Sequence, residues 1–167
     1  SHNRASLNKY LRALNVVLEK AGGPKLVHAV RMHGESNEHH VTIHIDVRNA
    51  FNELRRAMVI ARLGGIPELA HMQHFLFKCL QPESHLILDG EVWTEDGVSV
   101  LSAEGVVQGC PLASAIFAVV YQQELRELDQ ELKQVGGAAH AGADDVYAMG
   151  PAAATLAAVK RFKVELR

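Results

Sequence analysis

Three aspartates in this sequence stand where their carboxylates could share bound cations. Asp144 and Asp145 are adjacent within a short apolar stretch, and Asp46 ends a segment of strict apolar–polar alternation. Neighbouring carboxylates repel each other unless a cation lies between them. Mg²⁺ favours a few carboxylates together with substrate phosphates, and a site of this kind can hold two ions about 4 Å apart. The residues therefore predict metal-assisted phosphoryl transfer.

Each feature taken singly has a simpler interpretation. Paired aspartates are common in solvated turns, and an aspartate that follows a strand often caps the next helix. A Gln-Gly-x-Pro sequence such as that at 108–111 is often a plain helix start. The order and spacing of the three segments favour a joint site over three unrelated turns.

The elements that must position these acids follow from the periodicity of the chain. Residues 41–47 alternate, which predicts a half-buried strand with Thr42, His44 and Asp46 on its polar face. Residues 138–149 predict a hairpin with Ala143-Asp144-Asp145 at its tip. Asp89-Gly90 and Asp96-Gly97 mark two further hairpins. Helices are predicted over 5–20, 24–32, 52–63, 67–80, 111–133 and from 151 to the end. This order predicts an α+β fold in which helices cover an antiparallel sheet.

Composition sets limits on the class of protein. A length of 167 residues suits one domain, and 48% apolar and 22% charged residues are ordinary for a globular chain. The net charge of −2 weighs against nucleic-acid binding, because proteins that neutralise phosphates usually carry a basic face. The longest apolar run, 115–121, is too short to span a bilayer, and no signal peptide is recognisable. We therefore expect an intracellular protein, in the cytoplasm or nucleus, without a membrane segment.

Cysteine and histidine placement bears on a competing metal interpretation. Cys79 and Cys110 have no metal-ligand or redox spacing, which predicts two free, reduced thiols. The ten histidines are scattered, and no cysteine joins them at a ligand spacing. Zinc is therefore disfavoured.

Three ordered segments carry a family resemblance. Asp46 is followed five residues later by the aromatic Phe51; the second segment is Gly105-Val-Val-Gln-Gly-Cys-Pro-Leu-Ala-Ser114, and the third is Ala143-Asp144-Asp145. The trio resembles the reverse transcriptases of non-LTR retrotransposons. These enzymes carry Asp-x₄-aromatic, Gly-Val-x-Gln-Gly-x-Pro-Leu-Ser and x-Asp-Asp in that order. The likeness covers residues 24–166.

The resemblance implies a fold and a division of the chain. Residues 41–167 would be a polymerase palm, a ferredoxin-like antiparallel sheet with helices packed on one face and further helices inserted. Residues 1–40 would be a partial fingers region. No thumb is recognisable, so we expect a fragment of a longer retrotransposon protein.

The resemblance also implies an activity. The chain would be an RNA-directed DNA polymerase that transfers a nucleotide to a primer 3′-hydroxyl with two Mg²⁺ ions, for which Mn²⁺ can substitute. Its partners would be an RNA template, a DNA primer and a dNTP, with no membrane.

Site residues follow from the resemblance position by position. The catalytic metal ligands would be Asp46, Asp144 and Asp145. Phe51 would lie under the incoming sugar and favour dNTP over rNTP. Gln108 and Gly109 would line the nucleotide pocket. Arg48 would reach a phosphate or stay solvated at the strand end.

Two positions depart from the family pattern. Gly142 stands where the family carries an aromatic residue, normally Tyr, and Cys110 stands where an acidic or polar residue is common. Neither change removes a predicted metal ligand. Two alternatives stay open: a catalytically silent reverse-transcriptase-derived remnant or a module that binds nucleic acid or protein, and an unrelated α+β domain with chance acids. The last fails if Asp46 and the Asp144–Asp145 pair lie within metal-bridging reach of one another in a structure.

Overall fold

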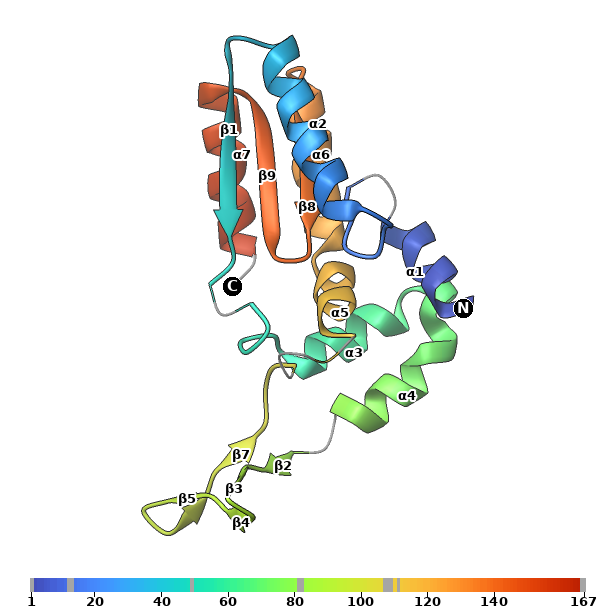
Figure 1. Ribbon diagram of the computed structural model, residues 1–167, viewed down its shortest axis with the longest axis vertical. Helices are drawn as coiled ribbons and strands as arrows, with labels where there is room; N and C mark the ends of the chain where they lie inside the picture. The colour runs from blue at the N-terminus through green and yellow to red at the C-terminus, as the bar shows by residue number, and fades with distance from the viewer. Residues whose placement is uncertain are drawn as a thin grey trace.

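A three-stranded antiparallel sheet forms one half of the molecule (Figure 1). The computed structural model describes residues 2–11, 14–48, 50–80, 83–106, 110 and 112–165. The sheet has the order β1-β9-β8, with β1 at His40–Asp46, β8 at Ala138–Gly142 and β9 at Asp145–Pro151. The alternating strand therefore pairs with the second strand of the aspartate hairpin, and the rest of the described chain is mostly helical.

The helices account for most of the remaining chain. Their bounds are His2–Leu11 (α1), Gly22–Ser36 (α2), Arg56–Gly64 (α3), Ala70–Leu80 (α4), Ala113–Val120 (α5), Gln122–Lys133 (α6) and Ala152–Glu165 (α7), with a 3₁₀ turn, η1, at Pro67–Leu69. No helix in the described ranges is long and apolar enough to cross a membrane.

The two faces of the sheet differ in what covers them. Ile45, Ala141 and Val146 point to one face, where they are buried against residues of α6 and α7, including Leu128 and Phe162. The opposite face carries the exposed Thr42, His44 and Asp46, as the alternation predicts. Part of this polar face is crossed by α2 over β8 (Figure 1). Helices therefore lie on both faces, and the expected one-sided cover applies to α6 and α7 but not to α2.

A second hydrophobic cluster lies among α1, α3, α4 and α5. The single helix predicted over 111–133 is instead divided at Tyr121, whose backbone (φ −95°, ψ 6°) is not helical. The buried residues of α5 belong to the helical cluster, whereas the buried leucines of α6, which are Leu125, Leu128 and Leu132, pack under the sheet. The break lets each half turn its apolar side to a different core. An ion pair between Arg62 of α3 and Glu124 of α6 joins the two halves.

The helix predicted over 5–20 ends at Leu11. Beyond it, residues 14–16 run alongside β8: Ala141 N–H donates to the Leu14 carbonyl at 2.6 Å, and Val16 N–H donates to the Ala141 carbonyl at 3.0 Å. The apolar residues that suggested a helix here instead belong to a segment that packs beside the sheet. A strand edge with unpaired backbone groups competes well for such a segment.

Three short β-ladders form a protruding arm, Ser84–Ser102 (Figure 1). They pair β2 (Ser84–His85) with β7 (Leu101–Ser102), β3 (Ile87–Leu88) with β4 (Glu91–Val92), and β5 (Thr94–Glu95) with β6 (Val98–Ser99). Both predicted Asp-Gly turns are confirmed, because all four of their residues have positive φ. That conformation is characteristic of tight two-residue hairpins. The ladders meet where Leu86, Trp93 and Val100 exchange backbone hydrogen bonds in a ring.

Candidate active site

Asp46 and Asp145 are direct cross-strand neighbours. β1 and β9 pair antiparallel in a register that places Asp46 opposite Asp145 and His44 opposite Tyr147. Residues opposite each other in such a pair share a face, with Cβ atoms about 4.5–5.5 Å apart. Asp144 immediately precedes Asp145 in the two-residue turn after β8. The structure thus brings Asp46, Asp144 and Asp145 to one corner of the sheet, which we call the aspartate corner.

The three carboxylates have different surroundings. His44 Nε2 donates to Asp145 Oδ1 at 2.8 Å, and the His44 ring stacks on Tyr147 with centroids 4.7 Å apart. The Asp145 side chain is half exposed. The side chains of Asp46 and Asp144 make no hydrogen bond or ion pair with any described residue.

The donor set suits a hard divalent cation, but the side chains do not complete a site in this conformation. Across the described ranges, no group of three or more His, Cys, Asp or Glu side chains is arranged to hold a metal ion. The backbone places carboxylate oxygens, which Mg²⁺ prefers, on adjoining strand ends. However, the Asp145 carboxylate is bound by His44. The fit is therefore good in ligand type and incomplete in side-chain geometry.

Histidines meet at the other end of the sheet. His33 Nε2 and His40 Nδ1 lie 3.0 Å apart. Burial, reinforced by His40 and His140, holds the pKa of His33 below its ordinary value, so the neutral imidazole is favoured. Cys79 and Cys110 are free and exposed. His40 begins β1 and Asp46 ends it, so the histidine pair lies away from the aspartate corner.

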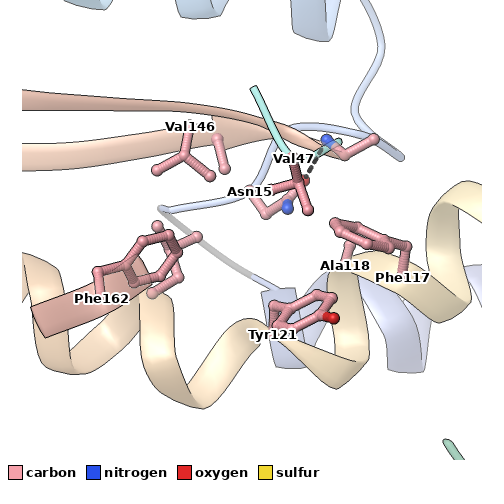
Figure 2. A pocket seen from close by; sticks show the side chains of 10 residues that line it. Asn15, Val47, Phe117, Ala118, Tyr121, Val146 and Phe162 are labelled. Atoms are coloured by element: carbon pink, nitrogen blue, oxygen red, sulfur yellow. Dashed lines mark hydrogen bonds between the residues drawn. The ribbon is translucent and has the colours of Figure 1, made fainter. Parts of the chain in front are cut away.

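The turn formed by Ala143 and Asp144, called the aspartate turn below, is hydrogen-bonded by Asn15, a residue to which the motifs in the sequence assign no role. Asn15 is buried, with 4% of its surface exposed. Its Oδ1 accepts a hydrogen bond from Val17 N–H at 3.1 Å. It also accepts one from Ala143 N–H at 3.3 Å, drawn as the dashed line from Asn15 in Figure 2. The sequence offers one sign of this role. Asn15 is the single polar residue in the otherwise apolar stretch 14–18, and a helix there would leave its amide side chain without a hydrogen-bond partner.

Gly142, the main departure from the family pattern, lies under α2. A Cβ added there would lie 3.1 Å from Leu26 Cδ2 and 4.0 Å from Val16 Cγ2. Leu26 is buried. A leucine from α2 therefore occupies the space above the position where an aromatic side chain would stand.

The predicted substrate-contacting residues are only partly described. Phe51 is half-buried, and its ring packs against Phe117 at a centroid distance of 5.6 Å. Arg48 is exposed at the end of β1. Gln108 and Gly109 lie outside the described residues.

The loop after Asp46 is joined to the glycine segment that begins at Gly105. Gly105 N–H donates to the Leu54 carbonyl at 2.9 Å, and Val106 N–H donates to the Phe51 carbonyl at 2.8 Å. Gly105 has φ 74°, and a Cβ there would fall 2.5 Å from the Asn52 carbonyl oxygen. No side chain fits this crossing without a shift of the backbone.

Arg56 binds the same segment from α3. Its guanidinium donates to the carbonyls of Ser102, Glu104 and Gly105 and to Ser102 Oγ, at 2.8–3.2 Å. A planar guanidinium is well suited to several acceptors at once. Arg56 therefore fixes the base of the arm against the loop that carries Phe51.

Comparisons with known proteins bear on the fold. No protein-family model matches the chain, and no curated protein matches it in sequence. Among solved structures, the chain is similar to apo telomerase from Candida tropicalis truncated from its C-terminal domain, with a TM-score of 0.55 at 13% identity. It is also similar to telomerase from Candida albicans in complex with a TWJ fragment of telomeric RNA, with a TM-score of 0.56 at 12% identity. The fold is reverse-transcriptase-like.

The reverse-transcriptase-like fold extends over nearly the whole chain but over a minor part of each neighbour. The matches cover 96% and 95% of this chain, and 35% and 31% of the two telomerase chains. The chain thus spans about a third of the length of these neighbours. At 13% and 12% identity the likeness concerns the fold alone.

Proposed function

We propose that the chain is the ferredoxin-like palm, with part of the fingers, of an RNA-directed DNA polymerase from a non-LTR retrotransposon. One observation carries the proposal: Asp46 and Asp145, distant in sequence, pair across two strands beside Asp144. This convergence lies within a reverse-transcriptase-like fold. The ordered sequence segments around Asp46, Gly105 and Asp144 support the same family.

Asp46, Asp144 and Asp145 would hold two Mg²⁺ ions, or Mn²⁺ in their place. Bound there, the ions would acidify a primer 3′-hydroxyl and neutralise charge at the reacting phosphate. The residues contribute hard oxygen ligands at strand ends, which are rigid positions. Asp145 would have to exchange its hydrogen bond with His44 for this role.

The remaining predicted residues would act on the substrates. Phe51, held by its backbone and by Phe117, would restrict the space beside the incoming sugar and favour dNTP over rNTP. Gln108 and Gly109 would line the nucleotide pocket, and Arg48, exposed beside Asp46, would meet a phosphate. We propose RNA as the template and DNA as the primer, and hence an intracellular site of action. The Candida albicans neighbour was solved with RNA.

Calorimetric titration with Mn²⁺ tests the proposal. We expect the wild-type chain to bind Mn²⁺, and Asp46→Asn and Asp144→Asn each to weaken binding about tenfold or more, because each removes a charged ligand. Asp96→Asn is a matched control, since Asp96 also lies in a two-residue hairpin turn but in the arm. Equal affinity in all four proteins would contradict the proposal.

A catalytically silent module is the second candidate. It is favoured by the His44–Asp145 hydrogen bond and by Leu26 above Gly142, both of which alter the corner where metal and primer would meet. Primer extension on poly(rA)/oligo(dT) with Mg²⁺ or Mn²⁺, by the chain and by any longer protein that contains it, separates the two. Extension that depends on Asp144 excludes silence, whereas metal binding without extension supports it.

A further inference from the structure

We propose that Asn15 is a positioning residue for the aspartate turn. Through Ala143 it would fix the direction in which Asp144 and Asp145 present their carboxylates. The proposal rests on the proposed function, because it concerns the same three ligands. It assigns a role in the site to a segment before β1 that carries none of the resemblance motifs.

Asn15 is held in a fixed place by its neighbours. Backbone hydrogen bonds of Leu14 and Val16 to Ala141 tie the segment to β8 on both sides of Asn15. Its Oδ1 is locked locally by Val17 N–H. The side-chain oxygen therefore projects from a rigid support when it accepts the Ala143 N–H.

The turn that Asn15 contacts has an unfavourable backbone conformation at Ala143. Gly142 and Asp145 close the ladder, which leaves Ala143 and Asp144 as the two turn residues. Ala143 has φ 59°, a left-handed conformation that costs a non-glycine residue energy. Such conformations persist only where the surroundings enforce them. Among the described contacts, the Asn15 hydrogen bond is the one made to the Ala143 N–H from outside the hairpin.

A small empty space lies beneath the turn. Asn15 and Ala143 line a small cavity, with room for about one water molecule, whose other walls include Phe117, Tyr121 and Phe162 (Figure 2). If the amide were removed, this cavity would enlarge directly below Ala143. The turn would then lose its hydrogen bond to Asn15 and could shift into the enlarged cavity. The carboxylates of Asp144 and Asp145 would shift with it.

Hydrogen exchange and Mn²⁺ titration of the chain together test the role. We expect Asn15→Ala to speed exchange of the Ala143 amide at least about tenfold, because its acceptor is lost. We expect Mn²⁺ affinity to fall about five- to tenfold, the effect of one hydrogen bond on the ligand geometry. Asn15→Asp keeps the acceptor and should keep the Ala143 amide slow, which provides the test if Asn15→Ala does not fold.

Thr155→Ala is the control for a general loss of stability. Thr155 is as buried as Asn15 and donates to the Pro151 carbonyl at the far end of β9. The Thr155→Ala variant should have a lower unfolding temperature than the wild type and the same Mn²⁺ affinity. Three results would each overturn the role of Asn15 without affecting the proposed function. The Ala143 amide could exchange at the wild-type rate in Asn15→Ala, or exchange fast in Asn15→Asp. Asn15→Ala could also bind Mn²⁺ with the same affinity as a wild type that does bind it. A wild type that binds no Mn²⁺ would overturn the proposed function as well.

Discussion

Asp46, Asp144 and Asp145 are the same residue type in one corner, yet only Asp145 has a side-chain partner among the described residues. That partner, His44, comes from the polar face of β1, two residues before Asp46. An acceptor oxygen held by an imidazole N–H is less available to a cation. In the proposed metal site, His44 would therefore determine how readily the Asp145 carboxylate binds a cation.

Replacement of His44 measures this competition. We expect His44→Ala to raise Mn²⁺ affinity about two- to fivefold, because a hydrogen bond worth about 1 kcal/mol no longer competes for Asp145. Calorimetry measures the change, and His85→Ala, which removes an exposed histidine of the arm, is the control. Weaker binding by His44→Ala would mean that the imidazole itself is a ligand.

Gly142 gives a second prediction at this scale. Gly142→Tyr restores the aromatic type of the family but meets Leu26, so we expect the free energy of unfolding to fall by about 1–3 kcal/mol. The double variant Gly142→Tyr/Leu26→Ala should lose less than the sum of its single variants, because the truncated side chain makes room for the ring. Urea unfolding of all three variants measures the coupling. Strict additivity would show that Leu26 is not the obstacle.

Local signals in the sequence predicted the strand and the hairpin that carry the aspartates more fully than the segments that pack against them. The alternation of 41–47 and the paired acids identified β1 and the hairpin tip, because both signals are local. The pairing of residues 14–16 with β8 was missed, since the apolar spacing of this stretch also fits a helix and the deciding edge lies more than a hundred residues later. The role of Asn15 was missed for the same reason. The break at Tyr121 was missed because it depends on two separate cores, which no local pattern reveals.

Arg56 carries the prediction that belongs to elements. Arg56→Ala should lower the free energy of unfolding by about 1.5–3 kcal/mol, because several carbonyls lose a charged donor. Amide exchange over residues 102–106 should become faster. Arg55→Ala is the matched control, as Arg55 is adjacent and exposed. Equal stability of the two variants would show that the arm base does not depend on the guanidinium.

At the scale of the whole molecule, charge is unevenly distributed. The arm, Ser84–Ser102, holds four of the 19 acidic residues (Asp89, Glu91, Glu95 and Asp96) and none of the 17 Lys and Arg. The rest of the chain therefore has 15 acidic against 17 basic residues, a balance that the overall charge of −2 conceals. The near-neutral composition weighs less against a nucleic-acid partner once the arm is considered separately.

Deletion of the arm tests this distribution. Ser84 and Ser102 are paired across β2 and β7, so a short Gly-Ser linker can replace the residues between them. We expect the shortened chain to bind poly(rA)/oligo(dT) about two- to fivefold more tightly at low salt, because four repelling charges are gone. Fluorescence anisotropy measures binding. A full-length variant with the four acids changed to amides should show the same gain, and a loss of binding in both would place the nucleic-acid contact on the arm.

The proposal that Asp46 and the adjacent Asp144 and Asp145 share metal ions is tested most directly by Mn²⁺ broadening of backbone amide NMR signals, because the effect falls off steeply with distance from the ion. We predict that the amides of Asp46, Asp144 and Asp145 broaden together at the lowest Mn²⁺ concentrations, and that Asp144→Asn shifts this broadening to higher concentrations. Broadening that begins in the arm or around His33 and His40, with the amides of the aspartate corner unaffected, would contradict the polymerase site.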